Sequence, residues 1–414
     1  MQIIKYTNLD KNFYTYTEFE NSESVKSIVK DVKNRGDEAV LEYSKKFGDG
    51  EIKNLEITQD EIQNALESVP NDILDAIKEA VANVRKFSQR QFLSINNLNT
   101  EINGAILGHS IIPLETTGAY VPGGNYPLPS SAIMSVTPAK VAGVKNVIVC
   151  SPKIKPETIV AAHISGADRI FRIGGVQAIA AMAYGTQTIP QVDKITGPGN
   201  KYVTAAKKEV YGICGIDFLA GPSEVMIVAD NSANSKFVAA DMLAQAEHDK
   251  DARAYLICLD EEFAKSVKTD IESFLVDLPT RDIAKYAIEK SFAIIVDNLE
   301  QAIEIANKKA PEHLELCLED ESIMTKFTNY GSLFLGNYSA EVLGDYCAGT
   351  NHVLPTNGIA KYTGGLSVFD FIKIQTYQKV PKESTLFDVA SKLANTEGLM
   401  AHKLAADLRK NKRG

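Results

Sequence analysis

No stretch of the 414-residue sequence approaches the roughly 18 consecutive apolar residues that a membrane-spanning helix needs. The N-terminus, MQIIKYTNLDKNF, also lacks the apolar core of a secretory signal. Positive charge is not in excess either: the net charge is −9, whereas nucleic-acid-binding surfaces are usually basic. The five cysteines are scattered and form no CxxC pair, which is typical of reduced thiols inside the cell. These absences predict a cytoplasmic protein that binds neither membranes nor nucleic acid.

The hydrophobic pattern changes along the chain. In the first hundred or so residues, runs such as SVKSIVKDVKNRGDEAVLEYSKKFG carry apolar residues at helical spacing, and a second helical run covers about residues 73–92. Further on, short β-rich runs such as VKNVIVCSP and EVMIVAD alternate with alanine-rich helical runs. Strands that alternate with helices are typical of parallel βαβ units. The sequence therefore predicts an α/β protein, and its length suggests two or three domains.

Two seams divide the predicted α/β part. The first is a Pro- and Gly-rich stretch near residue 119, and the second is AGPSE, near residue 224. We expect residues 1–14 to form an N-terminal segment. Residues 15–118 and 225–366 should form a first α/β lobe that includes the helical N-terminal part. Residues 119–224 should form a second α/β lobe, and residues 367–414 a helical C-terminal segment.

Histidines and a glutamine give the first candidate site. Gln245 and His248 lie one turn apart in the helical run DMLAQAEHDK and so share a helix face. The pair could hold a metal ion or could cap the edge of a core, since Gln is an uncommon zinc ligand. Three further histidines, His313, His352 and His402, and the loop residue Asp345 also lie near the ends of elements. If these residues converge they suit a metal or acid–base site, and otherwise each histidine is a local cap.

The motif PEHLEL gives a second candidate. Pro311 favours an extended run that begins with Glu312 and His313. Neighbouring residues on a strand point to opposite faces, so both side chains reach one cleft only if the strand is irregular at its start. A Glu and a His there would supply two bases of different strength. The alternative is a surface Glu beside a packed His.

Two glycine-rich loops give a third. RIGGVQAIA and ITGPGNKYVTAA each read as strand, glycine loop and helix, so their backbone N–H groups could hold a phosphate. Neither is GxGxxG, the usual dinucleotide fingerprint, and both could be simple tight turns. The residues alone thus predict a metal-dependent, acid–base enzyme on an α/β scaffold.

Eight motifs taken together resemble a known family. In chain order they are VPGGNYPLPSS, GGVQAIAAMAYGT, ITGPGNKYV, AGPSEVMIVAD, QAEHD, PEHLEL, GDYCAGTNHVLPT and EGLMAHK. This order resembles that of the histidinol dehydrogenase family over nearly the whole chain, least in the first hundred residues. The resemblance implies two incomplete Rossmann-like α/β lobes with parallel-rich sheets, and small helical segments at the two termini. The first lobe would carry the metal and catalytic residues, and the second would bind NAD.

The resemblance also implies roles for individual residues. One zinc ion per subunit would be held by Gln245, His248, Asp345 and His402. Glu312 and His313 would be the catalytic pair. NAD would contact Tyr120, Gln177 and Asn200. Substrate contacts would fall on Ser223, Glu397, His313 and the four metal ligands. Glu397 and His402 are five residues apart, about 140° around a helix, so both reach one site only if Gly398 distorts the backbone or the site spans two helix faces.

The implied activity is the NAD-dependent four-electron oxidation of L-histidinol, through L-histidinaldehyde, to L-histidine, at the end of histidine biosynthesis. The implied assembly is a homodimer that exchanges its amphipathic C-terminal segments, although a tail packed on its own chain is the simpler arrangement. Three other activities stay open. They are a zinc hydrolase with Glu312 as the base for a metal-bound water, a dehydrogenase of another amino alcohol or polyol, and a non-catalytic metal-binding protein.

Overall fold

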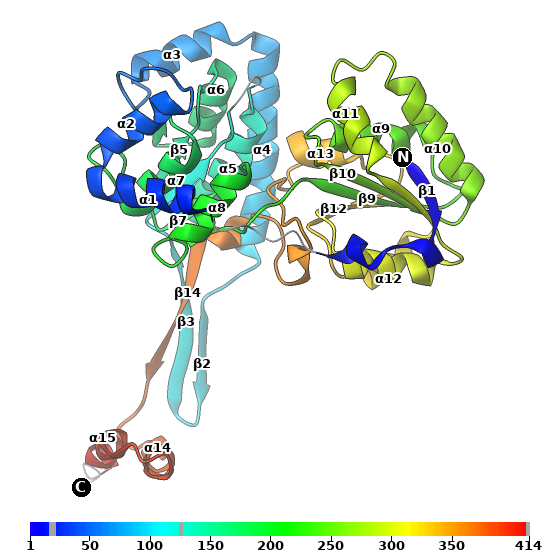
Figure 1. Cartoon of the computed structure of the whole chain (residues 1–414). Helices are drawn as coiled ribbons and strands as arrows, with labels where there is room; N and C mark the ends of the chain where they lie inside the picture. The colour runs from blue at the N-terminus through cyan, green and yellow to red at the C-terminus, as the bar shows by residue number, and fades with distance from the viewer. Residues whose placement is uncertain (16–21, 124–126, 411–414) are drawn as a thin grey trace.

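The computed structural model describes residues 1–15, 22–123 and 127–410. They form two α/β lobes and a long arm that projects from one of them (Figure 1). Residues 124–126 of the motif VPGGNYPLPSS and residues 411–414 of the expected C-terminal segment lie outside the described residues. Within the described part of the chain, each helix is too short or too polar to cross a bilayer.

The first sheet has five strands, all parallel. They are β4 (Thr116–Tyr120), β5 (Asn146–Cys150), β6 (Arg169–Phe171), β7 (Lys194–Thr196) and β8 (Gly215–Ile216). Their spatial order is β6-β5-β4-β7-β8, so the chain switches direction between β4 and β7. The helices between them are α5 (Pro129–Ala142), α6 (Pro156–Ser165), α7 (Gly175–Tyr184) and α8 (Lys201–Val210). In such sheets a crevice opens at the carboxyl ends of the strands beside the switch point.

Four N-terminal helices cover this lobe. They are α1 (Glu23–Arg35), α2 (Asp37–Lys46), α3 (Gln59–Ser68) and α4 (Asn71–Leu93). Helices α1 and α2 contact α7, α3 contacts α6, and α4 contacts α5. The apolar face of α1, with Val25 and Val32, shares one core with Ile179 of α7. This packing differs from the expected grouping of residues 15–118 with 225–366, because a helical pattern shows an apolar face but not the element that covers it.

The second sheet has six strands, also all parallel, in the order β1-β11-β10-β9-β12-β13. The strands are β1 (Gln2–Lys5), β9 (Glu224–Ala229), β10 (Arg253–Cys258), β11 (Phe292–Ile295), β12 (His313–Cys317) and β13 (Ser332–Leu335). The helices are α9 (Ser235–Ala246), α10 (Glu261–Phe274), α11 (Arg281–Glu289), α12 (Leu299–Lys309) and α13 (Glu341–Tyr346). The expected N-terminal segment is thus an edge strand of this lobe, followed by two short 3₁₀ turns.

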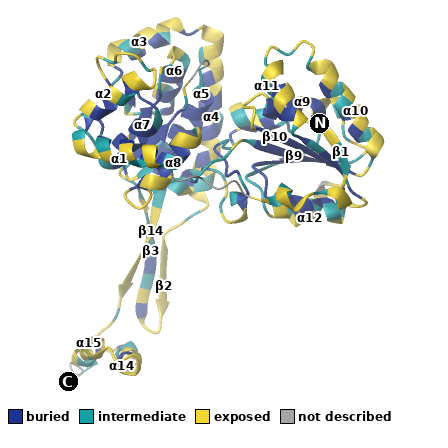
Figure 2. Ribbon diagram, viewed as in Figure 1, coloured by how far each residue is buried: buried dark blue, intermediate teal, exposed yellow. Residues whose placement is uncertain are grey.

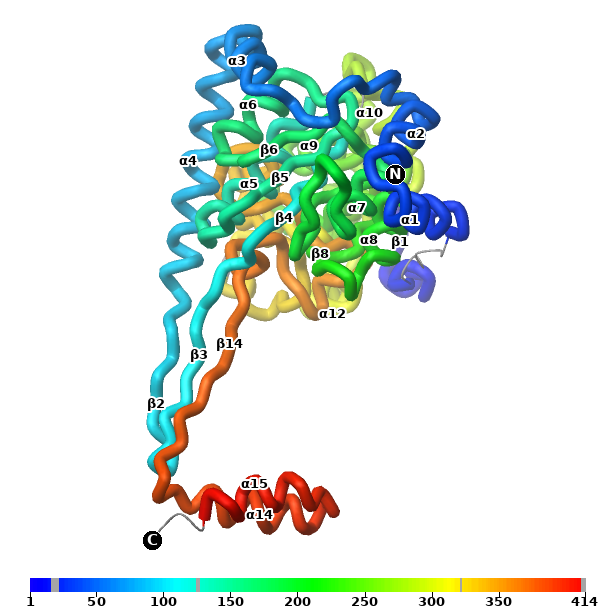
Figure 3. Tube along the Cα trace, turned by 90° about the vertical axis from the view of Figure 1, so that its left-hand side faces the viewer, coloured from blue at the N-terminus to red at the C-terminus, as the bar shows by residue number. Residues whose placement is uncertain are grey.

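The arm is a three-stranded antiparallel sheet in the order β14-β3-β2. Its strands are β2 (Leu98–Ile102), β3 (Ala105–Pro113) and β14 (Ile372–Lys379), and most of their residues are exposed or half-buried (Figure 2). Beyond β14, α14 (Leu386–Thr396) and α15 (Met400–Lys410) pack on each other at the tip. Both views place this helix pair far from the lobes (Figures 1 and 3). The expected helical C-terminal segment therefore begins with a strand.

Short 3₁₀ helices complete the described elements: η1 (Tyr6–Asn8), η2 (Lys11–Tyr14), η3 (Glu321–Lys326), η4 (Ile359–Lys361) and η5 (Val368–Phe371).

Candidate active site

Glu312 and His313 converge at the amino end of β12. Their side chains are 6% and 3% exposed, and His313 Nδ1 lies 3.8 Å from Glu312 Oε2. The chain turns sharply just before them, at Ala310, where φ is +53°. At this irregular start the two neighbouring side chains lie close to each other, and do not point to opposite faces as they would along a regular strand. A surface position for Glu312 is excluded.

One residue of the neighbouring strand holds both side chains. The backbone N–H of Glu224 donates to Glu312 Oε2 at 2.9 Å, and its carbonyl oxygen lies 3.3 Å from His313 Nδ1. The Glu224 carboxylate pairs in turn with Lys309 Nζ at 3.0 Å. With Nδ1 as the donor to that carbonyl, Nε2 is left as the ring atom that can accept a proton. Ser223, half-buried, directly precedes Glu224 at the same end of the sheet.

Charge and burial set the proton affinities of the pair. Burial raises the pKa of Glu312 to about 7, an effect that His313 opposes. Burial alone would lower the pKa of His313, but the carboxylates of Glu341, Glu312 and Asp345 outweigh it and hold that pKa well above its ordinary value. Glu341 Oε1 is 3.8 Å from Nδ1, and Asp345 Oδ1 is 3.5 Å from Nε2. The imidazole therefore lies within a ring of three carboxylates.

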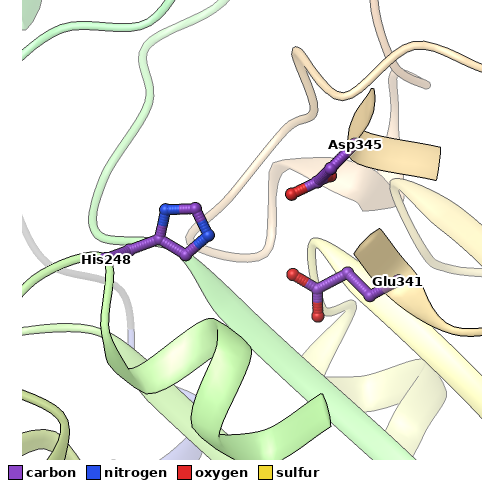
Figure 4. A group of neighbouring side chains, drawn as sticks. All are labelled: His248, Glu341 and Asp345. Carbon is purple, nitrogen blue, oxygen red and sulfur yellow. The ribbon is translucent and has the colours of Figure 1, made fainter. Parts of the chain in front are cut away.

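A candidate metal group adjoins this pair. One ligand atom each from His248, Glu341 and Asp345 lies within 4.8 Å of the others, and the three side chains point toward one another (Figure 4). His248 follows the end of α9, and the two carboxylates lie four residues apart on α13. Glu341 was not among the residues predicted from the sequence. Its spacing from Asp345 was the available signal.

Asp345 lies on a short helix and not in the expected loop. Gly344, next to it on this helix, is needed for packing. A Cβ at Gly344 would come within 2.6 Å of the Phe334 ring. The carbonyl oxygen of Asp345 accepts a hydrogen bond of 2.8 Å from His352 Nδ1. His352 thus supports the backbone of α13.

Gln245 is fully buried in the last turn of α9. Neither its amide oxygen nor its amide nitrogen is hydrogen-bonded to any described residue, and the same is true of Asp345 Oδ1. Buried polar atoms nearly always have partners, so these atoms are suited to a ligand. Amide, imidazole and carboxylate donors fit the mixed N/O ligand set of a divalent metal such as zinc.

The structure does not bring Glu397 and His402 to this group within one chain. Glu397 caps α14 and His402 lies on α15, both exposed, at the far end of the arm (Figure 3). Gly398, with φ at +76°, lies at the break between the two helices. Of the other predicted site residues of the six-stranded lobe, Ser223, Glu312 and His313 lie at the amino ends of β9 and β12. Gln245 and His248 lie at the end of α9, and Asp345 lies on α13.

The three predicted cofactor residues lie together in the other lobe. They line a cavity of about 690 Å³ at the carboxyl ends of β4 and β7. Tyr120 ends β4, and its hydroxyl accepts from the Gly175 N–H at 3.1 Å. Asn200 caps α8 through Oδ1, and Gln177 in the first turn of α7 is buried with Oε1 unpartnered among the described residues. The cavity occupies the switch-point crevice where α/β sheets bind nucleotides.

A nucleotide-sized crevice on one sheet and a buried acid–base pair beside a candidate metal group on the other are typical of an α/β enzyme that uses a nucleotide cofactor. The chain belongs to the histidinol dehydrogenase family, whose family model, described as histidinol dehydrogenase, matches residues 14–410. The family resemblance, the fold class and the oxidoreductase class expected from the sequence are thereby confirmed.

Similar proteins cover almost the same length. The histidinol dehydrogenase of Methanocaldococcus jannaschii is 46% identical over 92% of this chain and 90% of its own. That of Bacillus cereus is 47% identical over 93% of this chain and 92% of its own. The crystal structure of histidinol dehydrogenase from Elizabethkingia anophelis aligns with a TM-score of 0.94 at 39% identity, covering 99% of this chain and 98% of that one.

Proposed function

We propose that this chain oxidises L-histidinol through L-histidinaldehyde to L-histidine, with NAD as the electron acceptor and one zinc ion per subunit. The overall reaction consumes one water and two NAD, and yields two NADH and three protons. The observation that carries the proposal is the convergence of Glu312 and His313 beside the candidate metal group. A base within 3.5 Å of a metal-ligating carboxylate can act on a substrate held at that metal.

The metal would be held by Gln245, His248 and Asp345 of one chain and by His402 of a second. Support comes from the buried Gln245 amide and from Asp345 Oδ1, neither of which is hydrogen-bonded to a described residue. A zinc ion in this place would bind the amine and imidazole nitrogens of the substrate, while NAD would accept the hydride in each oxidation. The residues of the chain handle the protons.

His313 is the proposed base for both oxidations. Its Nδ1 is committed to the Glu224 carbonyl, so Nε2 takes the proton of the alcohol and later that of the aldehyde hydrate. Asp345 is one of three carboxylates that favour the charged imidazole. When Asp345 serves as a metal ligand its charge is shared, which leaves Nε2 better able to accept a proton.

Glu312 is the proposed base for hydration of the aldehyde between the two oxidations. Its pKa of about 7 leaves a substantial fraction ionised at neutral pH, as a base that must both take and release a proton requires. The bond from the Glu224 N–H holds the carboxylate in place while the proton moves.

The exposed tip of the arm supports exchange between two chains. Apolar residues recur along the two helices and the link between them, and six large ones are between 45% and 58% exposed: Val389, Leu393, Leu399, Met400, Leu404 and Leu408. A second copy related by twofold symmetry would cover this face and receive His402 and Glu397 in its own site. The arm holds these two residues too far from α9 and α13 of their own chain to serve there (Figures 1 and 3).

NADH formation from histidinol tests the proposed function. With purified, zinc-loaded protein, we expect histidinol and NAD to give histidine and NADH, and amide and ester substrates to remain intact. Hydrolysis of an amide or ester without NAD would support a zinc hydrolase. Faster NADH formation with another amino alcohol or a polyol would assign the site to that substrate.

A further inference from the structure

The cofactor cavity is lined by more than the three predicted residues. Helix α2 contributes Tyr43, and the turn after it contributes Phe47 and Asp49. Helix α1 also contributes to the lining. Glu312 and His313 are not part of the lining, since they belong to the other lobe. A dinucleotide whose nicotinamide reaches His313 would therefore leave its adenosine end in this cavity. Its 690 Å³ lies within the roughly 300–1,000 Å³ typical of small-molecule sites.

Two aromatic rings form one wall of the cavity. Tyr43 and Phe47 lie with ring centroids 6.0 Å apart and planes 12° from parallel. The Tyr43 hydroxyl donates to Asp31 Oδ2 at 3.0 Å, which fixes that ring. Phe47 is 53% exposed in the absence of a ligand. An aromatic pair stacked in this way, with one ring exposed, suits further stacking by an adenine ring.

Asp49 is held in a defined position next to this wall. Helix α2 ends in a Schellman motif: Gly48 has φ at +94°, and the Asp49 N–H donates to the Ser44 carbonyl oxygen at 2.9 Å. The lining residues carry one acidic side chain, Asp49, and one basic side chain, Lys46, while Tyr120, Gln177 and Asn200 are neutral. The acidic group therefore comes from a turn that precedes every strand of the five-stranded sheet in the sequence.

We propose that Asp49 makes the site selective for NAD over NADP, by accepting a hydrogen bond from the adenosine ribose and repelling a 2′-phosphate. The inference rests on the proposed function, because it takes the cavity as the NAD site. In dinucleotide-binding folds with the GxGxxG fingerprint, an acidic residue after the second strand has this role. The chain has no such fingerprint, and Asp49 supplies the same chemistry from the N-terminal helices.

Lys153 provides a way to sharpen the test. It lies near Asp49, and its charge counteracts the effect of burial, which raises the pKa of Asp49. A Cβ at Gly48 would lie 3.9 Å from Lys153 Nζ. The side chains of Asp49 and Lys153 also both line an adjoining cavity. Once the Asp49 carboxylate is neutralised, Lys153, together with Lys46 of the cavity lining, would be available to pair with a 2′-phosphate.

The experiment measures kcat/KM for NAD and for NADP with saturating histidinol. Asp49→Asn is expected to shift the NAD-to-NADP ratio toward NADP by about tenfold or more, since a like-charge contact and a ribose hydrogen bond are both lost. Lys153→Ala in the Asp49→Asn background should remove most of the gain with NADP. Glu51→Gln is the matched control, because Glu51 pairs with Lys45 at 2.7 Å close by but does not line the cavity, and its ratio should stay at the wild-type value.

An unchanged ratio in both Asp49→Asn and Asp49→Ser, with wild-type melting temperatures, would overturn the inference while leaving the proposed function intact. A wild-type protein that reduces neither NAD nor NADP with histidinol would instead overturn the proposed function. If an Asp49 variant fails to fold, binding of NADP and NAD to the folded Lys153→Ala protein decides. Strong preference for NAD there supports the inference, and equal affinity contradicts it.

Discussion

Replacing His313 with Ala is expected to lower the rates of both histidinol and histidinaldehyde oxidation by about 10²–10⁴, the usual cost of removing a general base. The side chain is buried, its Nδ1 faces the Glu224 carbonyl, and Nε2 is the ring atom proposed to accept the proton in both half-reactions. Glu312→Gln keeps the shape of the side chain and removes its charge. This variant should slow aldehyde oxidation more than alcohol oxidation, because hydration is the step assigned to Glu312. Initial rates with each substrate separate the two effects.

The matched control is Glu319→Gln, the same change just beyond the end of β12 at an exposed position. It should keep wild-type rates with both substrates. Two results would count against the assignment. Equal losses on both substrates for Glu312→Gln would remove its role in hydration, and near-normal rates for His313→Ala would show that another group is the base.

Removal of the metal should abolish activity with both substrates, and zinc should restore it at one ion per chain. The reason is that Gln245 and Asp345 Oδ1 are buried without hydrogen-bond partners among the described residues, and that two carboxylates face His248 closely. Bound metal should also raise stability, by roughly 2.7 kcal/mol when its free concentration is 100-fold above Kd. Elemental analysis and the melting temperature read out binding independently of activity.

His248→Ala should bind less than one zinc per chain, and His163→Ala, at an exposed position on α6, should bind as much as the wild-type protein. Full activity in a preparation shown to be metal-free would rule out a required metal. A normal zinc content in His248→Ala would show that the metal binds at another site.

Some of the site was predictable because local rules determine it. The spacing of Gln245 and His248 placed them close together, although His248 lies just beyond the end of α9 and not on the helix itself. Pro311 marked the irregular start of β12, where Glu312 and His313 lie close to each other. The structure adds that Glu341 joins this group. In the sequence, only a helical spacing of four distinguishes Glu341 and Asp345 from surface acids. The glycine between them, Gly344, argues against a helix there, but the structure shows that it is needed for packing against Phe334.

The long-range arrangement was not predictable from local patterns. The apolar face of α1 indicates burial, but only packing shows that it covers α7. Strands β3 and β14 pair although more than 250 residues separate them, and the exposed, largely polar residues of β14 carry little signal of a partner. For the same reason the sequence could not show that His402 lies at the end of an arm. The family resemblance identified His402 as a candidate ligand, and the structure shows that His402 is far from α9 within one chain.

Because His402 lies far from the other proposed ligands within one chain, the proposed four-ligand site requires two chains. One lobe contains the catalytic pair and three of the proposed ligands, Gln245, His248 and Asp345. The fourth, His402, lies beyond the arm. If two chains exchange their tips, each site takes its base from one subunit and its fourth metal ligand from the other. A tail that folds back onto its own chain would instead build each site from a single chain.

Refolding two inactive variants together distinguishes these arrangements. His402→Ala and His313→Ala are unfolded, mixed in equal amounts and refolded, and the presence of mixed dimers is verified with two different affinity tags. Random mixing makes about half of the dimers mixed, each with one intact site of two, so about a quarter of wild-type activity should return. No recovery of activity in a preparation that contains mixed dimers would contradict the exchange, because every site would then still carry one of the two lesions.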